Sequence, residues 1–386
     1  MKADYLFDGY KMLRDVVLIC DEEGTVETIL EENQAGDNIE YYSGILCPGF
    51  INCHCHLELS HLKGLIPEKQ GLVDFVFSVV SQRNQPDDSK QVAIIKAESD
   101  MSTSGIVAVG DICNSPDTII LKSGSRLNYY NFIELLGWTP ERAEAVLENG
   151  KQLALLFNET RKDGAHTSLC PHAPYSVSDK LWNIMTPGFK GKTVTIHNQE
   201  SAAENVFFET GLGDLNRMYT LMEIESGHFK APGTTSLQDY LPKLKSAARI
   251  LLVHNTFSSE KDLITARDFS DHVFFCLCPN ANLYIEDRLP DIGLFEELGA
   301  RIVLGTDSLA SNHQLSILEE MKTIKKYFPL IKTSHLLIWA CSNGAKALDF
   351  ENKLGDFKKG KQPGVVLIGN IVAGEITADS VSRRLV

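Results

Sequence analysis

Residues 48–58 read PGFINCHCHLE, an apolar run that ends in two histidines two positions apart. Side chains two apart on a strand leave the same face, and a rise of about 3.3 Å per residue puts His54 and His56 roughly 7 Å apart. That spacing suits two imidazoles on one metal ion, although so short a pattern is equally compatible with an ordinary strand. Cys53 and Cys55 alternate with the histidines and are expected to point away from them, toward surrounding helices.

The composition indicates a globular protein that acts on a small molecule. The chain has 386 residues, 43% of them hydrophobic, which is enough for two average domains or one large barrel with an appendage. Its net charge of −14 argues against an extended phosphate-binding surface. No nucleic-acid partner is therefore expected.

The sequence also predicts a cytoplasmic protein with no membrane partner. Residues 1–20 carry five charges between Asp4 and Asp15, so they lack a signal-peptide core, and no apolar run approaches membrane-spanning length. Nine cysteines, an odd number without a repeating spacing, fit reduced thiols better than a disulfide framework.

Residues 49–354 read as repeated strand-then-helix units. The predicted strands are Gly49–His54, Gly105–Asp111, Leu127–Glu134, Thr167–Pro171, Thr193–His197, Arg249–His254, Val273–Cys278 and Arg301–Thr306. Helical periodicity is seen, for example, in Gly71–Gln82, Pro140–Phe157 and Leu315–Tyr327. Eight short, almost continuously apolar runs alternating with helices predict an α/β protein with a TIM-like (β/α)8 barrel. A doubly wound open sheet is the alternative, which the absence of a glycine-rich phosphate loop after the first strand disfavours.

The two ends of the chain resemble each other and differ from the middle. Residues 1–47 alternate β-like runs with turn residues and predict a small antiparallel sheet, and residues 364–371 form another strand-like run. We expect residues 1–48 and 355–386 to combine into one small β-sandwich domain, because each needs a partner for its apolar face. Two separate caps at opposite poles are the alternative.

Catalytic groups of a barrel lie at the carboxyl ends of its strands, and five of the eight predicted ends deliver a histidine or aspartate. These residues are His54 with His56, His172, His197, His254 and Asp307. Three neutral imidazoles and one carboxylate would hold a divalent transition metal, zinc or iron, and leave a position for water. Each residue alone is equally compatible with a structural role. Their common placement predicts a hydrolytic metal site.

Glu200, in the segment HNQE at residues 197–200, is the candidate general acid/base. Residues three apart on a continuing strand face opposite ways, so the strand must end near His197 for Glu200 to turn back over the ion. A protonated carboxyl there would deliver a proton to a ring nitrogen of a substrate. An exposed glutamate in the first turn of a helix is the alternative interpretation.

Four segments taken in order resemble the amidohydrolase superfamily, in its branch of mononuclear-metal aminohydrolases. They are PGFINCHCHLE, TIHNQES (195–201), LLVHN (251–255) and LGTDS (304–308). The resemblance implies that His54, His56, His197 and Asp307 bind the metal, that Glu200 transfers protons and that His254 orients or deprotonates the attacking water. It implies one ion, because no lysine ends the fourth strand, where binuclear members carry one. Zinc is the expected metal, with iron as the alternative. It also implies a homodimer.

Four further segments look most like those of the aminofutalosine deaminases, which act on a 6-aminopurine nucleoside. They are HLELS (56–60), GLVDF (71–75), CPNANL (278–283) and GTDSLASN (305–312). The segment PHAPY (171–175) is similar in the adenosylhomocysteine and methylthioadenosine deaminases, where the matching histidine contacts the substrate. Expected substrate contacts are His172, Glu58 and Glu134. One departure is Asn280–Ala281–Asn282, which stands where Arg–Ser–Asn is common.

The expected function is hydrolytic deamination of an aminopurine-type substrate such as 6-aminodeoxyfutalosine, with release of ammonia. Alternatives are an adenosylhomocysteine, methylthioadenosine or guanine deaminase, a chlorohydrolase or ring-opening hydrolase on the same site, and a non-catalytic metal-binding barrel. Two further residues are open as pocket-lining candidates, Cys278 and His313.

Overall fold

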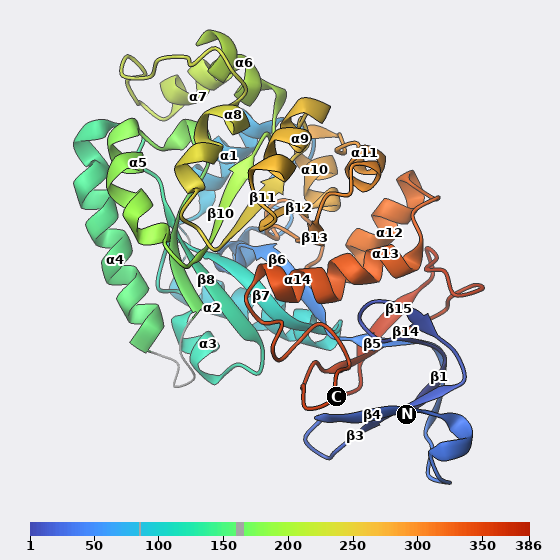
Figure 1. The fold of residues 1–386 in the computed structure, drawn as a ribbon. Coiled ribbons are helices and arrows are strands. Elements are labelled where there is room, and N and C mark those ends of the chain that lie inside the picture. Colours follow the sequence, from blue (N-terminus) through green and yellow to red (C-terminus); the bar gives the residue numbers. More distant parts are fainter. Residues whose placement is uncertain (85, 160–165) are drawn as a thin grey trace.

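Two four-stranded parallel sheets form the centre of the molecule (Figure 1), of which the computed structural model describes residues 1–84, 86–159 and 166–386. The first sheet consists of β6 (Phe50–Cys55), β7 (Ile106–Cys113), β8 (Asn128–Leu135) and β9 (His166–Pro171). The second consists of β10 (Thr193–Asn198), β11 (Arg249–His254), β12 (Val273–Leu277) and β13 (Ile302–Leu304). All eight correspond to predicted strands, with their ends displaced by two residues at most.

The two sheets adjoin at both of their edges. Where β9 meets β10, the Ser168 hydroxyl donates to the Thr193 carbonyl over 2.7 Å. Where β13 meets β6, the Thr306 N–H donates to the His54 carbonyl over 3.0 Å, and Cys55 and Asp307 form a parallel bridge. This α/β arrangement fits a TIM-like barrel.

Helices surround the strands on their outer side (Figure 1). They are α1 (Leu72–Gln82), α2 (Asp87–Thr103), α3 (Ile119–Gly124), α4 (Ala143–Glu159), α5 (Asp179–Met185), α6 (Ala202–Thr210), α7 (Leu215–Leu221), α8 (Ser236–Tyr240), α9 (Glu260–Phe269), α10 (Pro279–Glu286), α11 (Ile292–Glu297), α12 (Ile317–Tyr327), α13 (Thr333–Ile338) and α14 (Gly344–Ala347). The three predicted helices correspond to α1, α4 and α12. Because side chains cover both faces, β6 and β10 are buried along their whole length.

Strands from both ends of the chain share a five-stranded sheet beside the central strands (Figure 1). Its order is β15 (Val381–Arg384), β14 (Val365–Gly369), β5 (Tyr41–Pro48), β1 (Lys2–Phe7) and β2 (Met12–Leu13), and a separate ribbon pairs β3 (Val16–Cys20) with β4 (Val26–Glu31). The antiparallel pairing of β14 with β5 joins the two ends.

The prediction of an antiparallel N-terminal sheet was wrong in one respect. β1 pairs in parallel with β5, a strand that the sequence reading left unassigned. The connection from β1 to β5 runs through β2, β3 and β4, which is long enough for the chain to cross over and bring β5 beside β1 in the same direction. A Cβ at Gly49, where β5 continues into β6, would lie 2.2 Å from Val107 Cγ1, which shows how closely the chain passes β7 there.

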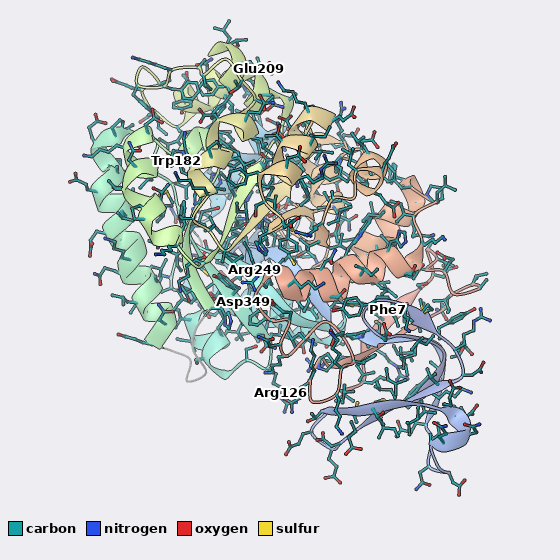
Figure 2. All side chains as sticks on the ribbon, viewed as in Figure 1. Phe7, Arg126, Trp182, Glu209, Arg249 and Asp349 are labelled. Atoms are coloured by element: carbon teal, nitrogen blue, oxygen red, sulfur yellow. The ribbon has the colours of Figure 1, made fainter. Side chains whose placement is uncertain are left out.

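Phe7 lies where the terminal sheet meets the central strands and belongs to the main hydrophobic core, fully buried (Figure 2). Arg249 begins β11 at the amino end of its strand and pairs with Asp349 over 2.8 Å (Figure 2). These contacts lie away from the carboxyl ends of the strands, where the candidate site is found. Among the helices of the described residues, none combines the length and apolar character needed to cross a membrane.

Candidate metal centre and active site

The four predicted metal ligands lie together at the carboxyl ends of β6, β10 and β13. His56 Nε2 is 3.2 Å from His54 Nε2 and 3.3 Å from His197 Nε2. Asp307 Oδ1 is 3.5 Å from His54 Nε2 and 3.4 Å from His56 Nε2. Residues separated by up to 253 positions in the sequence therefore direct one donor atom each at a common point.

These distances fit a bound cation. Donors around a tetrahedral ion with bonds of about 2.0–2.1 Å lie about 3.3–3.4 Å apart. Burial lowers the pKa of His56 to about 3 and that of His197 well below its ordinary value, so both imidazoles are neutral near pH 7. The His197 Nδ1–H donates to the His172 carbonyl over 2.8 Å, which leaves the Nε2 lone pair for an ion. The residues present therefore fit a divalent transition metal.

Asp307 is held in place by its own loop. Its N–H and that of Thr306 both donate to the His54 carbonyl, and its φ of 56° turns the chain just after β13. The Ser311 hydroxyl donates to Oδ2, which leaves Oδ1 toward the histidines. Burial alone would raise the pKa of the Asp307 carboxyl, but its bond with His54 and the nearby imidazoles hold that pKa well below its ordinary value.

Glu200 and His254 face each other beside the four candidate ligands. His254 Nε2 lies 3.5 Å from Glu200 Oε1. Burial raises the pKa of Glu200 well above its ordinary value, and the negative charge of Asp307 raises it further. Burial lowers the pKa of His254 to about 4. Burial therefore favours the protonated carboxyl and the neutral imidazole at neighbouring positions, one able to give a proton and the other able to take one.

The chain meets the requirement that the strand end near His197. β10 ends at Asn198, and Gln199 has a φ of 46°, which reverses the chain and directs Glu200 to the site. The sequence reading missed the residue that holds this turn, Glu204, whose Oε1 accepts the Gln199 N–H over 2.9 Å. A carboxylate four residues after the candidate acid, in the first turn of α6, was the available signal.

The three expected substrate contacts, His172, Glu58 and Glu134, line one cavity together with Glu200 and His254. The His172 Nδ1 lies 2.9 Å from the Ser176 hydroxyl. Burial raises the pKa of Glu58 and of Glu134 to about 7 each.

Two further residues of this cavity were missed from the sequence, because they sit in loops without a pattern. The Asn114 amide donates to Glu134 Oε2 over 3.0 Å, and its N–H donates to Glu58 Oε2 over 3.1 Å. Arg83 Nη2 lies 3.4 Å from Glu58 Oε1. Both residues therefore fix carboxylates that face the cavity.

The cavity has a volume of about 320 Å³ and changes character along its length. Its floor holds the candidate ligands and acid/base groups. Its outer wall is apolar, with residues from α1 and from the segments around Trp138 and Met222. Arg83 and Arg142 line it as well. The apolar wall belongs to a second hydrophobic cluster, separate from the main core, that includes Phe75, Trp138 and Met222.

Cys278 and His313 do not line this cavity. The Cys278 side chain is fully buried, whereas His313 is largely exposed and pairs with Glu68 over 3.2 Å. Asn280, which stands where arginine is common in the Arg–Ser–Asn triplet, does not line this cavity either. Its side-chain amide donates to Glu320 Oε1 over 3.0 Å.

Comparison with known proteins gives one family model, described as "Amidohydrolase family", which matches residues 45–382. An adenosine deaminase of Helicobacter pylori is 29% identical over 85% of this chain and 80% of its own length. An aminodeoxyfutalosine deaminase of Deinococcus radiodurans is 28% identical over 80% of this chain and 74% of its own length.

The fold is similar to that of a solved structure, the Helicobacter pylori aminofutalosine deaminase in complex with methylthio-coformycin. The TM-score is 0.81 at 23% identity, over 96% of this chain and 92% of the other. At this identity the similarity supports the α/β fold.

Proposed function

The chain belongs to the amidohydrolase family and is a hydrolase acting on C–N bonds, and on that premise we propose that it deaminates an aminopurine nucleoside of the 6-aminodeoxyfutalosine type. The observation that carries the proposal is the placement of Glu200 3.5 Å from His254 beside the cluster of donors, where burial raises the pKa of Glu200 and lowers that of His254. Replacement of a ring amine by oxygen needs a group that takes a proton from water and another that gives one to the ring.

The proposed metal ligands are His54, His56, His197 and Asp307, and zinc suits a site of three imidazoles and one carboxylate. When bound, such an ion lowers the pKa of a coordinated water toward about 7. Asp307 and His254 hold the attacking water, and His254 Nε2 accepts one of its protons as the water oxygen bonds to the carbon that carries the amine. Glu200 gives its proton to the ring nitrogen beside the carbon that carries the amine. The protonated His254 gives its proton to the amine, the C–N bond breaks and ammonia departs. The remaining proton of the added hydroxyl passes to Glu200 as the carbonyl forms, which restores the acid.

The nucleoside tail is proposed from the cavity. A free base such as guanine would leave the apolar outer part along α1 unfilled. An apolar tail would cover Phe75 and Trp138, and Arg83 and Arg142 suit an anionic group on that tail. The relatives named adenosine deaminase and aminodeoxyfutalosine deaminase support a 6-aminopurine nucleoside as the substrate class.

We also propose that the eight central strands close into a complete barrel over residues 49–354. Residues 1–48 and 355–386 would form the composite β-sandwich. The pairing of β14 with β5 supports this division, as do the bonds at both sheet edges.

The test is ammonia release by zinc-loaded protein from 6-aminodeoxyfutalosine, adenosylhomocysteine, methylthioadenosine, adenosine, guanine and cytosine. Glu200→Gln removes the proton donor and should lower kcat about a hundred- to ten-thousandfold while the protein still binds metal. The matched control is Glu209→Gln, an exposed glutamate on α6 (Figure 2), which should retain full activity. Ammonia from no member of the panel, in protein with one metal per chain, would contradict the proposal and favour dehalogenating or ring-opening chemistry.

A further inference from the structure

Asn282 contacts the candidate base His254 through both ends of its side-chain amide. It lies in α10 and is 1% exposed. Its Oδ1 is 2.9 Å from His254 Nδ1, and its Nδ2 donates to the His254 carbonyl over 3.4 Å. The second bond orients the amide, because only the NH2 end can donate to a carbonyl. The oxygen end therefore faces the imidazole.

This orientation determines which ring nitrogen of His254 carries hydrogen. An amide oxygen only accepts hydrogen bonds, so Nδ1 must be the protonated nitrogen of the neutral ring. Nε2 then has a free lone pair. It is buried, faces Glu200, and has no hydrogen-bond partner among the described residues. The lone pair is thus directed at the place where the attacking water would lie.

We propose that Asn282 is a positioning residue that holds His254 in the tautomer with hydrogen on Nδ1. The effect of Asn282 on turnover rests on the proposed deamination. The assignment of the His254 tautomer does not depend on that function. In that state Nε2 accepts the proton of water, and the resulting imidazolium keeps its Nδ1–H bond to Asn282. In the other tautomer Nε2 already carries hydrogen, so the proton has no acceptor on this ring atom.

Asn280, two positions earlier in the same helix, provides a matched comparison. Its N–H and side-chain amide donate to Glu320, over 2.9 and 3.0 Å, and its Oδ1 accepts from the Thr323 hydroxyl. Among the described residues, the hydrogen-bond partners of Asn280 are Glu320 and Thr323, and His254 is not one of them. Replacement of either asparagine removes an amide from α10, but only replacement of Asn282 removes the partner of His254.

The first test reads the tautomer directly, by nitrogen-15 NMR of zinc-loaded protein with labelled histidine. The His254 signals are assigned from their loss in His254→Gln. In the wild type and in Asn280→Leu we expect hydrogen on Nδ1 and an unprotonated Nε2. In Asn282→Leu we expect a mixture of tautomers or the opposite one, whereas Asn282→Asp, which still accepts from Nδ1, should restore the wild-type pattern. Hydrogen on Nε2 in the wild type, or an unchanged pattern in Asn282→Leu, would overturn the proposal.

The second test separates positioning from folding. Asn282→Leu should lower kcat about ten- to a hundredfold with a smaller change in KM, and Asn282→Asp should recover part of the loss. If Asn282→Leu and Asn280→Leu lowered kcat equally, in proportion to their loss of thermal stability, Asn282 would be structural only. If no panel substrate released ammonia from the wild type, the proposed function would fail, and the NMR experiment would still decide the tautomer.

Discussion

Gly305 lies at the closest approach between the end of β13 and the candidate ligand His54. A Cβ added there would lie 2.8 Å from His54 Cβ, 2.9 Å from Cys276 Sγ and 3.0 Å from Cys278 Sγ. His54 Cβ is next to the backbone and the two sulfurs end short side chains, and all three residues are fully buried, so they have little space in which to move aside. The absence of a side chain at this position therefore lets the candidate ligands converge.

We predict that Gly305→Ala displaces His54 and lowers the metal content of the purified protein. Overpacking of this kind typically costs about 1–3 kcal/mol, so the melting temperature should fall as well. Metal analysis after dialysis and thermal unfolding measure the two effects. The control is Gly188→Ala, where a Cβ would meet nothing within 4 Å. Full metal content in Gly305→Ala would show that His54 does not depend on this close packing.

At the scale of elements, a buried ion pair connects β7 and α3 to the segment that follows His56. Lys122 Nζ is 2.5 Å from Asp111 Oδ2, and the two side chains are 2% and 0% exposed. Asp111 Oδ1 accepts the Leu57 N–H over 2.9 Å. Burial alone would lower the pKa of Lys122, but Asp111 and Cys113 raise it above its ordinary value. The pair thus fixes the chain between His56 and Glu58.

We predict that Lys122→Met destabilises the protein by about 3–5 kcal/mol, because it leaves the Asp111 carboxylate buried without its cation. Urea unfolding measures the change. The matched control is Lys96→Met on α2, where the pair with Asp100 is 74% and 61% exposed and is worth about 0.5 kcal/mol or less. Equal losses of unfolding free energy in Lys122→Met and Lys96→Met would contradict the assignment of Asp111 to the buried pair.

At the scale of the whole molecule, buried titratable groups of two kinds determine how stability depends on pH. The pKa of Glu58, Glu134 and Glu204 is about 7 each and that of Glu320 about 8, against an ordinary 4.5, because burial favours the neutral carboxyl. The pKa of His56 is about 3 and that of His172 and His254 about 4, against an ordinary 6.5, because burial favours the neutral imidazole.

The unfolding free energy of the metal-free protein should be greatest between about pH 4.5 and 6.5. Above pH 6.5 the four carboxyls alone matter: the unfolded chain has released protons that the folded chain keeps, so stability falls as pH rises to about 8. Below pH 4.5 stability falls because the unfolded chain binds protons at the histidines that the folded chain excludes, and Asp307, whose folded pKa is held low, acts in the same direction. Urea unfolding of chelator-treated protein from pH 3 to 9 measures the curve. A rise in stability between pH 6.5 and 8 would contradict the buried, neutral state of the carboxyls.

The apolar pattern of the sequence was sufficient to predict the central strands and to propose the candidate site residues at their ends. Strands buried on both faces are almost continuously apolar, so their ends are visible in the sequence, and a barrel places functional groups at those ends. The candidate ligands His54, His56, His197 and Asp307 and the candidate base His254 were proposed in this way, and in the structure they belong to two groups of possible metal donors that share His54. Glu200 could be named as well, because a candidate ligand lies three residues before it.

Only the tertiary structure revealed the residues that hold these groups in position. Asn282, Glu204 and the Lys122–Asp111 pair act across contacts between elements that lie 5 to 54 residues apart in the chain. A hydrogen bond of this kind depends on where two elements meet, and an asparagine or buried glutamate has no periodic pattern that marks its partner. The same reason applies to β5, whose parallel pairing with β1 joins strands that are far apart in the chain and connected through β2, β3 and β4.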